Sequence, residues 1–306
     1  MAQASRDIQR RLRSVRSTRK ITKAMELVAA AKMRRAVTKV LSTRSYSDLA
    51  WQTVLHLIKK VDQGHHPFFQ DRKDVKKVGI ILIGTNRGLC GSFNAQLVNK
   101  VVQSIALHHP EKIETEIISF GSRIRTEAAR KKLAVVADFP KTDITQSITE
   151  ISPISHLVVK EFLEKKYDRV FLAYTDFVSS LRQVPHVKQL LPIVPAIDER
   201  LAHIGHSQSY EIDSIEVESF SEFLFEPNIQ DILLSFLPRL IEVQIYQAVL
   251  ESEASEHSAR MLAMRNASDA ASDMIDYLVL AYNQARQAGI TSELAEIAAG
   301  SAALQN

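Results

Sequence analysis

The residues most suggestive of chemistry lie in the glycine-containing turn Gly84–Gly91, which follows an apolar run. A turn of this kind between a strand and a helix can present backbone N–H groups to a phosphate. A phosphate-binding loop, however, has Gly-Lys-Ser/Thr after four intervening residues, whereas Leu89 stands at that position here and the turn has no lysine. The Gly-x-Gly-x-x-Gly pattern of dinucleotide-binding proteins is not completed either. We therefore predict that these glycines serve backbone geometry and that the turn binds no nucleotide.

Cys90 is the one cysteine of the chain, so no disulfide forms within the chain, no thiol cluster is available for zinc, and a reducing compartment is indicated. A helix N-terminus would lower the pKa of the Cys90 thiol and activate it as a nucleophile. A lone cysteine in an apolar turn is more often inert, and we favour the inert interpretation.

The ten histidines lie mostly in loops beside Gly or Pro, without the spacing of metal ligands, and we expect them to be exposed. They include His65–His66, His108–His109, His203 and His206. His257 differs because it lies on the apolar seam of a helix, where a hydrogen-bonded contact between helices is expected. No motif of a hydrolase and no assignable pair of carboxylates is present. The sequence thus predicts no catalytic residue, no metal site and no cofactor.

Length and composition indicate which elements must position these residues. The chain has 306 residues, of which 45% are apolar, enough for about two domains with a real core. Glycine and proline number only 9 each, so the chain has few places to turn and much of it is expected to be long helix. No apolar run approaches the about 18 residues that a transmembrane helix needs. Any membrane association is therefore expected to go through a partner.

Charge is unevenly distributed along the chain. Residues 1–45 contain thirteen Lys and Arg against two acidic residues, a net charge of +11, although the whole chain carries only +4. A basic arm of this kind fits an acidic partner, whether nucleic acid, anionic lipid or an acidic protein surface. The alternative is the solvated face of a helix, and the charge run alone does not separate the two.

The N-terminal segment has seam positions, most of them apolar, at alternating spacings of three and four from Ile8 to Val61, with no proline before Pro67. This predicts one helix over residues 3–60 and a first domain of residues 1–62, ended by the turn 64–67. Arg19, Thr22 and Glu26 occupy seam positions that a self-sufficient coiled coil fills with Leu or Ile. We therefore expect a partner surface along this part of the helix.

The middle segment, residues 75–218, alternates short apolar runs with helical stretches and predicts an α/β domain with a largely parallel sheet. The predicted strands are 78–83, 116–120, 133–137 and 170–174, with 184–191 and 210–218 at an edge because Pro185 and Pro192 interrupt or bound the first of these two. The predicted helices are 92–108, 122–131 and 153–166.

The C-terminal segment, residues 228–303, keeps a strict alternation of three and four over seventeen seam positions from Leu233 to Gly289. This predicts a second very long helix, which Pro238 bends near its start. Small side chains surround its middle, residues 266–272, which indicates either close approach of another surface or a solvated stretch. The predicted fold class is α/β: a long antiparallel coiled coil of the N- and C-terminal helices with an inserted Rossmann-like α/β domain.

Three segments now carry a specific resemblance. They are Lys20–Ala36 (KITKAMELVAAAKMRRA), Gly88–Gly91 (GLCG) with Asn94, and Tyr282–Ile297 continuing through Gly300 and Ala303. In this order they resemble the N-terminal, central and C-terminal motifs of the gamma subunits of F-type ATP synthases, so that the resemblance covers essentially the whole chain. The N-terminal motif begins near the start of the sequence, and in this the chain is more similar to bacterial members of the family than to an unprocessed organelle precursor.

The resemblance implies a rotor shaft that turns inside a hexamer of α and β subunits and couples ion flow through the membrane c-ring to ATP synthesis or hydrolysis at the β subunits. It implies a chain that is not itself catalytic and carries no cofactor. The implied partners are the α, β and epsilon subunits and the c-ring, not nucleic acid, with a peripheral place on the cytoplasmic side of a bacterial plasma membrane. The coupling contacts implied by motif position are Met25, Arg34, Arg35, Arg260, Gln287, Thr291 and Glu293.

Departures and alternatives accompany the resemblance. Ser92–Phe93 replace the glycine and aliphatic residue common in the family, and Cys90 lacks the partner cysteine of chloroplast members, so thiol regulation is not expected. Met25 and Thr291 have a second interpretation, as packing residues of the coil. A nucleic-acid-binding coiled coil would use the same basic arm, but the C-terminal helix has no matching basic stripe. A nucleotide-binding enzyme would need the phosphate-binding residues that the turn lacks. The sequence leaves open whether H⁺ or Na⁺ is coupled.

Overall fold

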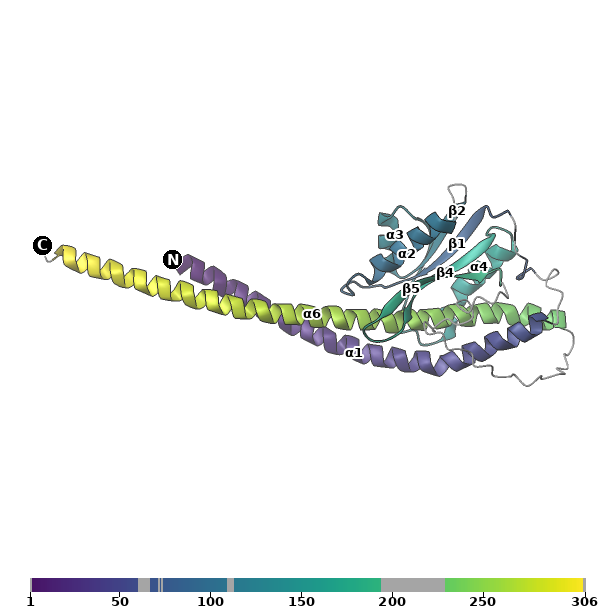
Figure 1. Ribbon diagram of the computed structural model, residues 1–306, viewed down its shortest axis with the longest axis horizontal. Coiled ribbons are helices and arrows are strands. Elements are labelled where there is room, and N and C mark those ends of the chain that lie inside the picture. Colours follow the sequence, from purple (N-terminus) through teal and green to yellow (C-terminus); the bar gives the residue numbers. More distant parts are fainter. Residues whose placement is uncertain are drawn as a thin grey trace. The chain divides into compact units, whose positions relative to one another are not determined.

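A computed structural model describes residues 2–59, 67–70, 72, 74–108, 113–193 and 229–304 (Figure 1). The chain divides into two compact units. The terminal unit comprises Met1–Ala29 and Arg260–Asn306, and the sheet unit comprises Ala30–Ala259. Two long helices, α1 (Ala2–Lys59) and α6 (Ile229–Leu304), contribute to both units. Their bounds agree with the helices predicted from the apolar spacing, and α6 continues through Pro238.

In the terminal unit, α1 and α6 run antiparallel, with both chain ends at the same end of the unit (Figure 1). Leu12 packs against Ile275 and Leu278, and residues 8, 15 and 279 flank this cluster. For the small-residue stretch 266–272, the sequence allowed either close packing against another surface or exposure to solvent, and the structure shows both. Ser268 and Ala271 are buried at the seam, whereas Asn266, Asp269 and Ala270 are exposed.

The sheet unit contains a five-stranded sheet in the order β3-β2-β1-β4-β5. Its strands are β1 (Lys77–Ile83), β2 (Glu114–Phe120), β3 (Ala134–Phe139), β4 (Arg169–Phe177) and β5 (Gln183–Leu191). The first four are parallel, whereas β5 pairs antiparallel with β4. The prediction of a largely parallel sheet with 184–191 at its edge is confirmed. The predicted strand 210–218 lies outside the described residues, as do residues 64–66 of the predicted turn.

The two faces of the sheet are covered by different helices because the side chains of a strand alternate between faces. Val78, Ile80 and Leu82 of β1 pack on one face with α2 (Phe93–His108) and α3 (Ser122–Arg130). The intervening β1 residues point to the other face, where α4 (Ser152–Leu163) and the first part of α6 cover the sheet. This second cluster contains Ile81, Ile83, Val158, Phe162, Leu240, Ile241 and Ile245.

The long helices also pair within the sheet unit. Ala36 and Val40 of α1 pack with Leu250 and Ala254 of α6. Close by, Thr43 Oγ1 donates a 2.8 Å hydrogen bond to Gln247 Oε1. Residue numbers rise along α1 as those of their partners fall, so the pairing is antiparallel here too. Across the described residues, no helix combines the length and the apolar character that crossing a membrane requires.

Candidate functional site

Of the seven predicted coupling residues, five lie in the terminal unit and two, Arg34 and Arg35, in the sheet unit. On α6, Gln287 is 27 residues beyond Arg260, which at 1.5 Å per residue is ~40 Å along the helix axis. The predicted residues therefore form no single pocket. They are positions distributed along two helices.

The C-terminal part of α6 is exposed. Gln287, Thr291 and Glu293 all face solvent in this chain, and the Thr291 hydroxyl donates a 3.0 Å hydrogen bond to the Gln287 carbonyl within the helix. The sequence interpretation that Thr291 packs the coil is therefore wrong for this unit. Beside these residues runs an apolar stripe that the motif comparison missed, consisting of Ile290, Leu294 and Ile297, which are 51%, 62% and 69% exposed. The spacing of four and three residues puts these side chains on one helix face and was visible in the sequence.

Met25 occupies an intermediate position in the terminal unit. Its neighbours Thr22 and Ala29 are buried at the seam, whereas Met25 is half-buried. Ile21 and Val28, four residues before it and three after, are 58% and 56% exposed. Met25 thus contributes to the packing and, with Ile21 and Val28, to an apolar strip on the outside of α1. Arg260 of α6 is half-buried as well.

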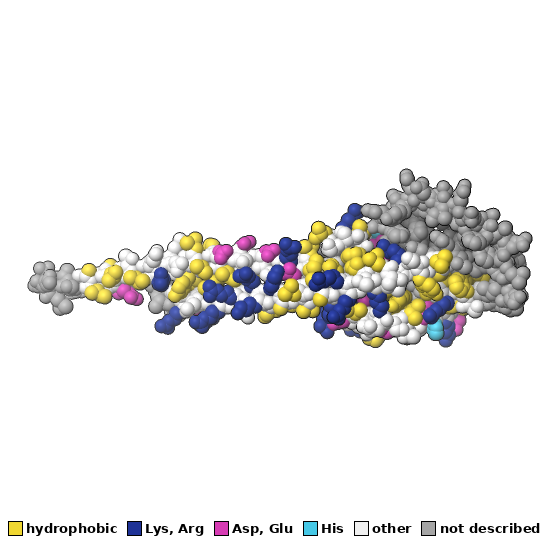
Figure 2. All heavy atoms as spheres, turned by 90° about the horizontal axis from the view of Figure 1, so that it is seen from below, with side chains coloured by type: hydrophobic (Ala, Val, Ile, Leu, Met, Phe, Trp, Pro, Cys, Tyr) yellow, Lys and Arg dark blue, Asp and Glu magenta, His cyan; other side chains and the backbone are white. Residues whose placement is uncertain are grey.

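The basic arm divides into two groups with different roles. In the terminal unit, every Lys and Arg of α1 is exposed, and Figure 2 shows Lys and Arg side chains gathered along the paired helices next to apolar ones. In the sheet unit, three basic residues are used by the fold instead: Lys32, Lys39 and Arg44 pair with Asp143, loop carbonyls and Glu251. Arg34 and Arg35 remain exposed between them. The basic arm is therefore partly a structural element and partly a surface.

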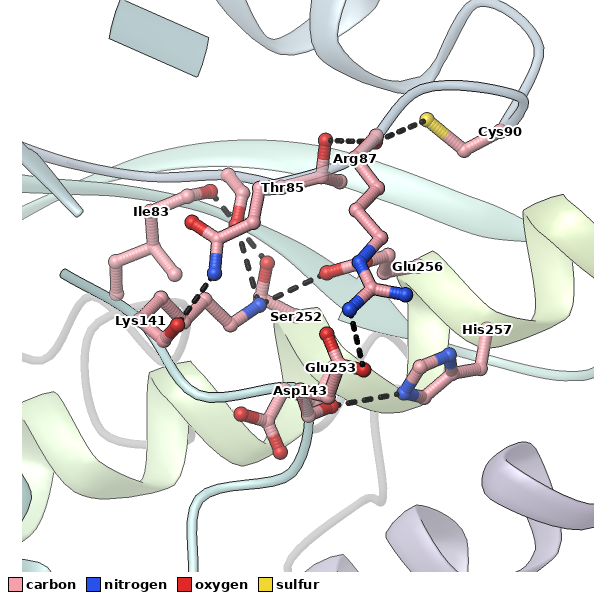
Figure 3. A network of polar contacts seen from close by, with 12 residues as sticks. Ile83, Thr85, Arg87, Cys90, Lys141, Asp143, Ser252, Glu253, Glu256 and His257 are labelled. Carbon is pink, nitrogen blue, oxygen red and sulfur yellow. Dashed lines mark hydrogen bonds and ion pairs between the residues drawn. The ribbon is translucent and has the colours of Figure 1, made fainter. Parts of the chain in front are cut away.

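The turn after β1 is closed by hydrogen bonds within the turn and with Asn94 of α2; Figure 3 shows the contacts among Thr85, Arg87 and Cys90. Asn94 of α2 accepts a 3.2 Å hydrogen bond from the Thr85 backbone N–H and donates one of 2.7 Å to the Thr85 hydroxyl. The Thr85 hydroxyl in turn donates to the Arg87 carbonyl at 2.8 Å. The backbone N–H groups of Gly84 and Thr85 are therefore already engaged, the former with Phe120 O. This geometry agrees with a structural turn.

The glycines of this turn have separate reasons. A Cβ on Gly84 would lie 2.3 Å from the Ile124 Cβ of α3, so glycine at this position makes room for the Ile124 side chain. Gly91 has a φ of 62°, which favours glycine. A Cβ on Gly88 would meet nothing within 4 Å. The prediction that the glycines serve backbone geometry thus fits Gly84 and Gly91 and is wrong for Gly88, for which the structure of this chain gives no reason.

Cys90 is buried, at 4% exposure. Its Sγ lies 3.9 Å from Asn94 Nδ2 and 4.0 Å from the Arg87 carbonyl oxygen. A thiol enclosed in this way is shielded from reagents and fits the inert interpretation.

The described histidines differ from the prediction that most lie in loops, because His56, His108 and His156 lie in α1, α2 and α4. His257 and His186 differ in their contacts as well. His257 Nε2 lies 3.1 Å from the carbonyl oxygen of Asp143, so its contact is with a loop and not with another helix. His186 of β5 is not loop-exposed but partly buried on the sheet, with Nε2 3.3 Å from Asp176 Oδ2, within ion-pair distance although not aligned for a hydrogen bond. Burial lowers the pKa of His186, and Asp176 opposes that shift. Among the residues that the structure describes, no group of three metal-ligating side chains forms; residues 65, 66, 109, 203 and 206 lie outside them.

Comparison with known proteins identifies the family. The family model described as ATP synthase matches residues 4–304. The ATP synthase gamma chain of Roseiflexus castenholzii is 38% identical over 302 residues, covering 98% of both chains, and that of Xanthomonas axonopodis pv. citri is 36% identical over 299 residues, covering 98% of this chain and 99% of its own. The chain belongs to the ATP synthase gamma chain family. The resemblance found in the three sequence motifs is thereby confirmed.

Solved structures agree with this assignment at the level of fold. A chain of the Euglena gracilis mitochondrial ATP synthase, described as OSCP/F1/c-ring in rotational state 3, superimposes with a TM-score of 0.67 at 20% identity, covering 99% of this chain and 95% of its own. A chain of the Tetrahymena thermophila central stalk/c-ring gives a TM-score of 0.58 at 24% identity, covering 81% and 99%. The fold of this gamma-family chain, two terminal helices around a parallel-rich sheet, is thus that of ATP synthase central stalks.

Proposed function

We propose that this chain is the central rotor shaft of an F-type ATP synthase. It couples ion flow through the membrane c-ring to ATP synthesis or hydrolysis at the β subunits by rotating inside the α/β hexamer. The observation that carries the proposal is membership of the gamma chain family over residues 4–304, together with two long helices whose outer faces stay exposed in the isolated chain. The chain performs no bond chemistry itself and binds no cofactor.

A shaft of this kind acts through differences in contact. A β subunit interconverts between conformations of different nucleotide affinity, and the shaft shifts their populations only if it contacts one conformation more favourably than another. The outer faces of α1 and α6 differ in chemical character. In the terminal unit, α1 carries eight exposed basic residues, whereas α6 carries the apolar stripe at residues 290, 294 and 297. Rotation then presents a different surface to each β subunit in turn.

The residues that make these contacts are assigned by motif and exposure. Gln287, Thr291 and Glu293 are exposed beside the apolar stripe, and Met25 belongs to an apolar strip on α1, so both helices offer surface to the α and β subunits. Arg260 joins this set by motif position. Arg34 and Arg35, which are exposed farther along α1, supply charge for acidic β-subunit loops.

We further propose three functional parts. Residues 1–62 and 228–303 form the coiled coil, and residues 75–218 form the α/β domain, which rests with the epsilon subunit on the c-ring. The chain is peripheral to a bacterial plasma membrane on its cytoplasmic side and reaches it through these partners. The relatives named here are ATP synthase chains, so the nucleic-acid-binding alternative is not proposed.

Reconstitution with matching α and β subunits tests the proposal. The purified chain, the α subunit and the β subunit are measured alone and in all combinations by sizing and by ATP turnover. We expect one copy to join an α/β hexamer and cooperative turnover to appear only then. A chain that forms no complex, or that binds DNA or hydrolyses ATP by itself, would overturn the proposal.

A further inference from the structure

The loop between β3 and the short helix η2 (Ile148–Glu150) is attached to α6 by buried polar groups (Figure 3). The Lys141 ammonium donates to Glu256 Oε2 at 2.9 Å and to the carbonyl oxygen of Gly84, at the end of β1, at 3.1 Å. The Lys141 and Glu256 side chains are only 2% and 10% exposed. One ammonium therefore joins three parts of the sheet unit: the loop, the end of β1 and the long helix.

Two further contacts repeat this attachment along one face of α6. Glu253 accepts from the Thr145 backbone N–H at 3.0 Å and from the Thr145 hydroxyl at 2.6 Å. His257 Nε2 lies 3.1 Å from the Asp143 carbonyl oxygen. Residues 253, 256 and 257 are three and four apart, so they share one helix face. Burial raises the pKa of Glu253 above its ordinary value, although Lys141 and Thr145 partly oppose that shift.

The same loop binds α1 from its other side. Lys32 donates to Asp143 Oδ2 at 2.8 Å, and Lys39 donates to the Gln146 carbonyl oxygen at 2.8 Å and also to that of Thr145. The Lys32 ammonium holds the pKa of Asp143 below its usual range, so this carboxylate is charged at neutral pH. The loop thus connects α1, α6 and the end of β1.

The loop is itself held in shape. Glu150 accepts from the Thr142 hydroxyl and from the Gln146 and Ser147 backbone N–H groups at 2.7, 2.7 and 3.2 Å. Asn86 of the turn donates to the Lys141 carbonyl oxygen. A loop fixed at both ends and internally is a rigid bracket rather than a flexible tether.

These contacts differ in kind from the apolar packing around them. Burial of apolar surface is non-directional, so it specifies the angle of a helix over a sheet less sharply than a polar contact does. Hydrogen bonds and buried ion pairs weaken steeply when their angle or distance changes. The polar contacts lie where the long helices leave the sheet unit, since His257 is two residues before its boundary at Ala259 and Lys32 is two residues after Ala30.

We propose that Lys141, Asp143 and Thr145, with their partners on α1 and α6, form the torsional joint that fixes the long helices against the sheet, so that torque passes between them without slippage. We call this set the loop clamp; it comprises Lys32, Lys39, Lys141, Asp143, Thr145, Glu253, Glu256 and His257. The inference rests on the proposed rotor function. The clamp residues are positioning residues, because they act by holding the helices that contact the other subunits.

The test measures torsional stiffness in the assembled complex. The chain is combined with α and β subunits fixed to a surface through β, and a bead is attached at Leu107→Cys on α2. The central contact of the clamp is removed by Lys141→Met with Glu256→Leu, which replaces both members of the buried pair by apolar side chains. Because angular variance is inversely proportional to joint stiffness, we expect the variance of the bead angle during pauses to rise at least about twofold. ATP turnover without load should stay within about twofold of the unaltered chain.

The matched control is Arg72→Gln. Arg72 pairs with Asp168 at 3.1 Å and donates to the carbonyl oxygens of Phe162 and Tyr167, all inside the sheet unit and outside the loop clamp. Its loss should leave the variance unchanged. Glu256→Gln provides a second, milder clamp variant with an intermediate variance. If the unaltered chain rotates and the bead-angle variance is the same in all variants, the clamp proposal alone is overturned. If the unaltered chain does not assemble or rotate, the proposed function is overturned and the clamp with it.

Discussion

Lys141 and Glu256 are 115 residues apart in the chain, and their Nζ and Oε2 atoms meet at 2.9 Å with both side chains almost fully withdrawn from solvent. Burial of two charges costs several kcal/mol per ion before their attraction is counted. The pair is therefore sensitive to loss of either member, and its value is geometric as much as energetic. It defines which face of α6 meets the loop after β3.

Removal of one member of this pair should be more harmful than removal of both. Lys141→Met leaves the Glu256 carboxylate buried without its cation, and we expect a loss of about 3–5 kcal/mol in the free energy of unfolding. Lys141→Met combined with Glu256→Leu should recover most of that loss, as measured by urea unfolding of the isolated chain. Lys160→Met breaks a pair with Glu164 whose side chains are 71% and 60% exposed. It should change stability by no more than about 0.5 kcal/mol. A single variant as stable as the unaltered chain would contradict this prediction.

Two glycines of one turn should respond differently to the same substitution. Gly84→Ala places a methyl group 2.3–2.7 Å from three atoms of Ile124, so α3 must move away from the turn. Such overpacking costs about 1–3 kcal/mol. Gly88→Ala meets no atom within 4 Å and should leave the melting temperature unchanged or slightly raised. Calorimetry of the two variants checks this, and equal melting temperatures would show that α3 yields without cost.

Acidification should weaken the sheet unit through His186. Its pKa lies below the ordinary value of 6.5 because burial, with smaller effects of Lys188 and Lys100, outweighs the attraction of Asp176. Below about pH 6.5 the unfolded state therefore binds a proton that the folded state does not. As the pH is lowered through this range, the free energy of unfolding decreases by at most about 1.4 kcal/mol per pH unit. Urea unfolding at pH 7.5 and 5.5 should show a smaller loss for His186→Gln than for the unaltered chain. Identical losses would mean that His186 titrates equally in both states.

Substitution of the exposed stripe on α6 should weaken assembly and spare the isolated chain. Ile290→Ser, Leu294→Ser and Ile297→Ser change side chains that are already in solvent, so the melting temperature of the free chain should not fall. If the α/β hexamer encloses them, each loses about 1.5–3 kcal/mol of burial, or about tenfold or more in affinity. Sizing and titration with α and β subunits measure this. Unchanged affinity would place the stripe outside the interface.

Cys90 should be unreactive until the sheet unit opens. At 4% exposure its thiol meets a reagent only after local unfolding, so modification should be at least about 100-fold slower than in urea. Gly84→Ala should accelerate it, because the same turn encloses the sulfur. Rapid labelling of the unaltered chain would contradict the enclosed position.

The long-period features of this protein follow from its amino-acid sequence alone. An unbroken alternation of three and four apolar positions specifies a long helix wherever it occurs, because the 3.6-residue period puts those residues on one face. It therefore predicted α1 and α6 within a few residues, as runs of β-branched and aliphatic residues predicted β1 and β4. Three local motifs were sufficient to indicate the family, since motif residues are contiguous in the chain.

Contacts between residues far apart in the chain become visible only in the folded structure. Lys32, Lys39 and Arg44 have the same sequence character as Arg34 and Arg35, yet the first three are used by the fold and the last two remain exposed. His257 was placed correctly on a helix face, but its partner is a loop carbonyl that no periodicity specifies. The physical reason is that a buried polar contact depends on direction and on two segments brought together by packing, whereas an apolar stripe depends only on spacing within one segment.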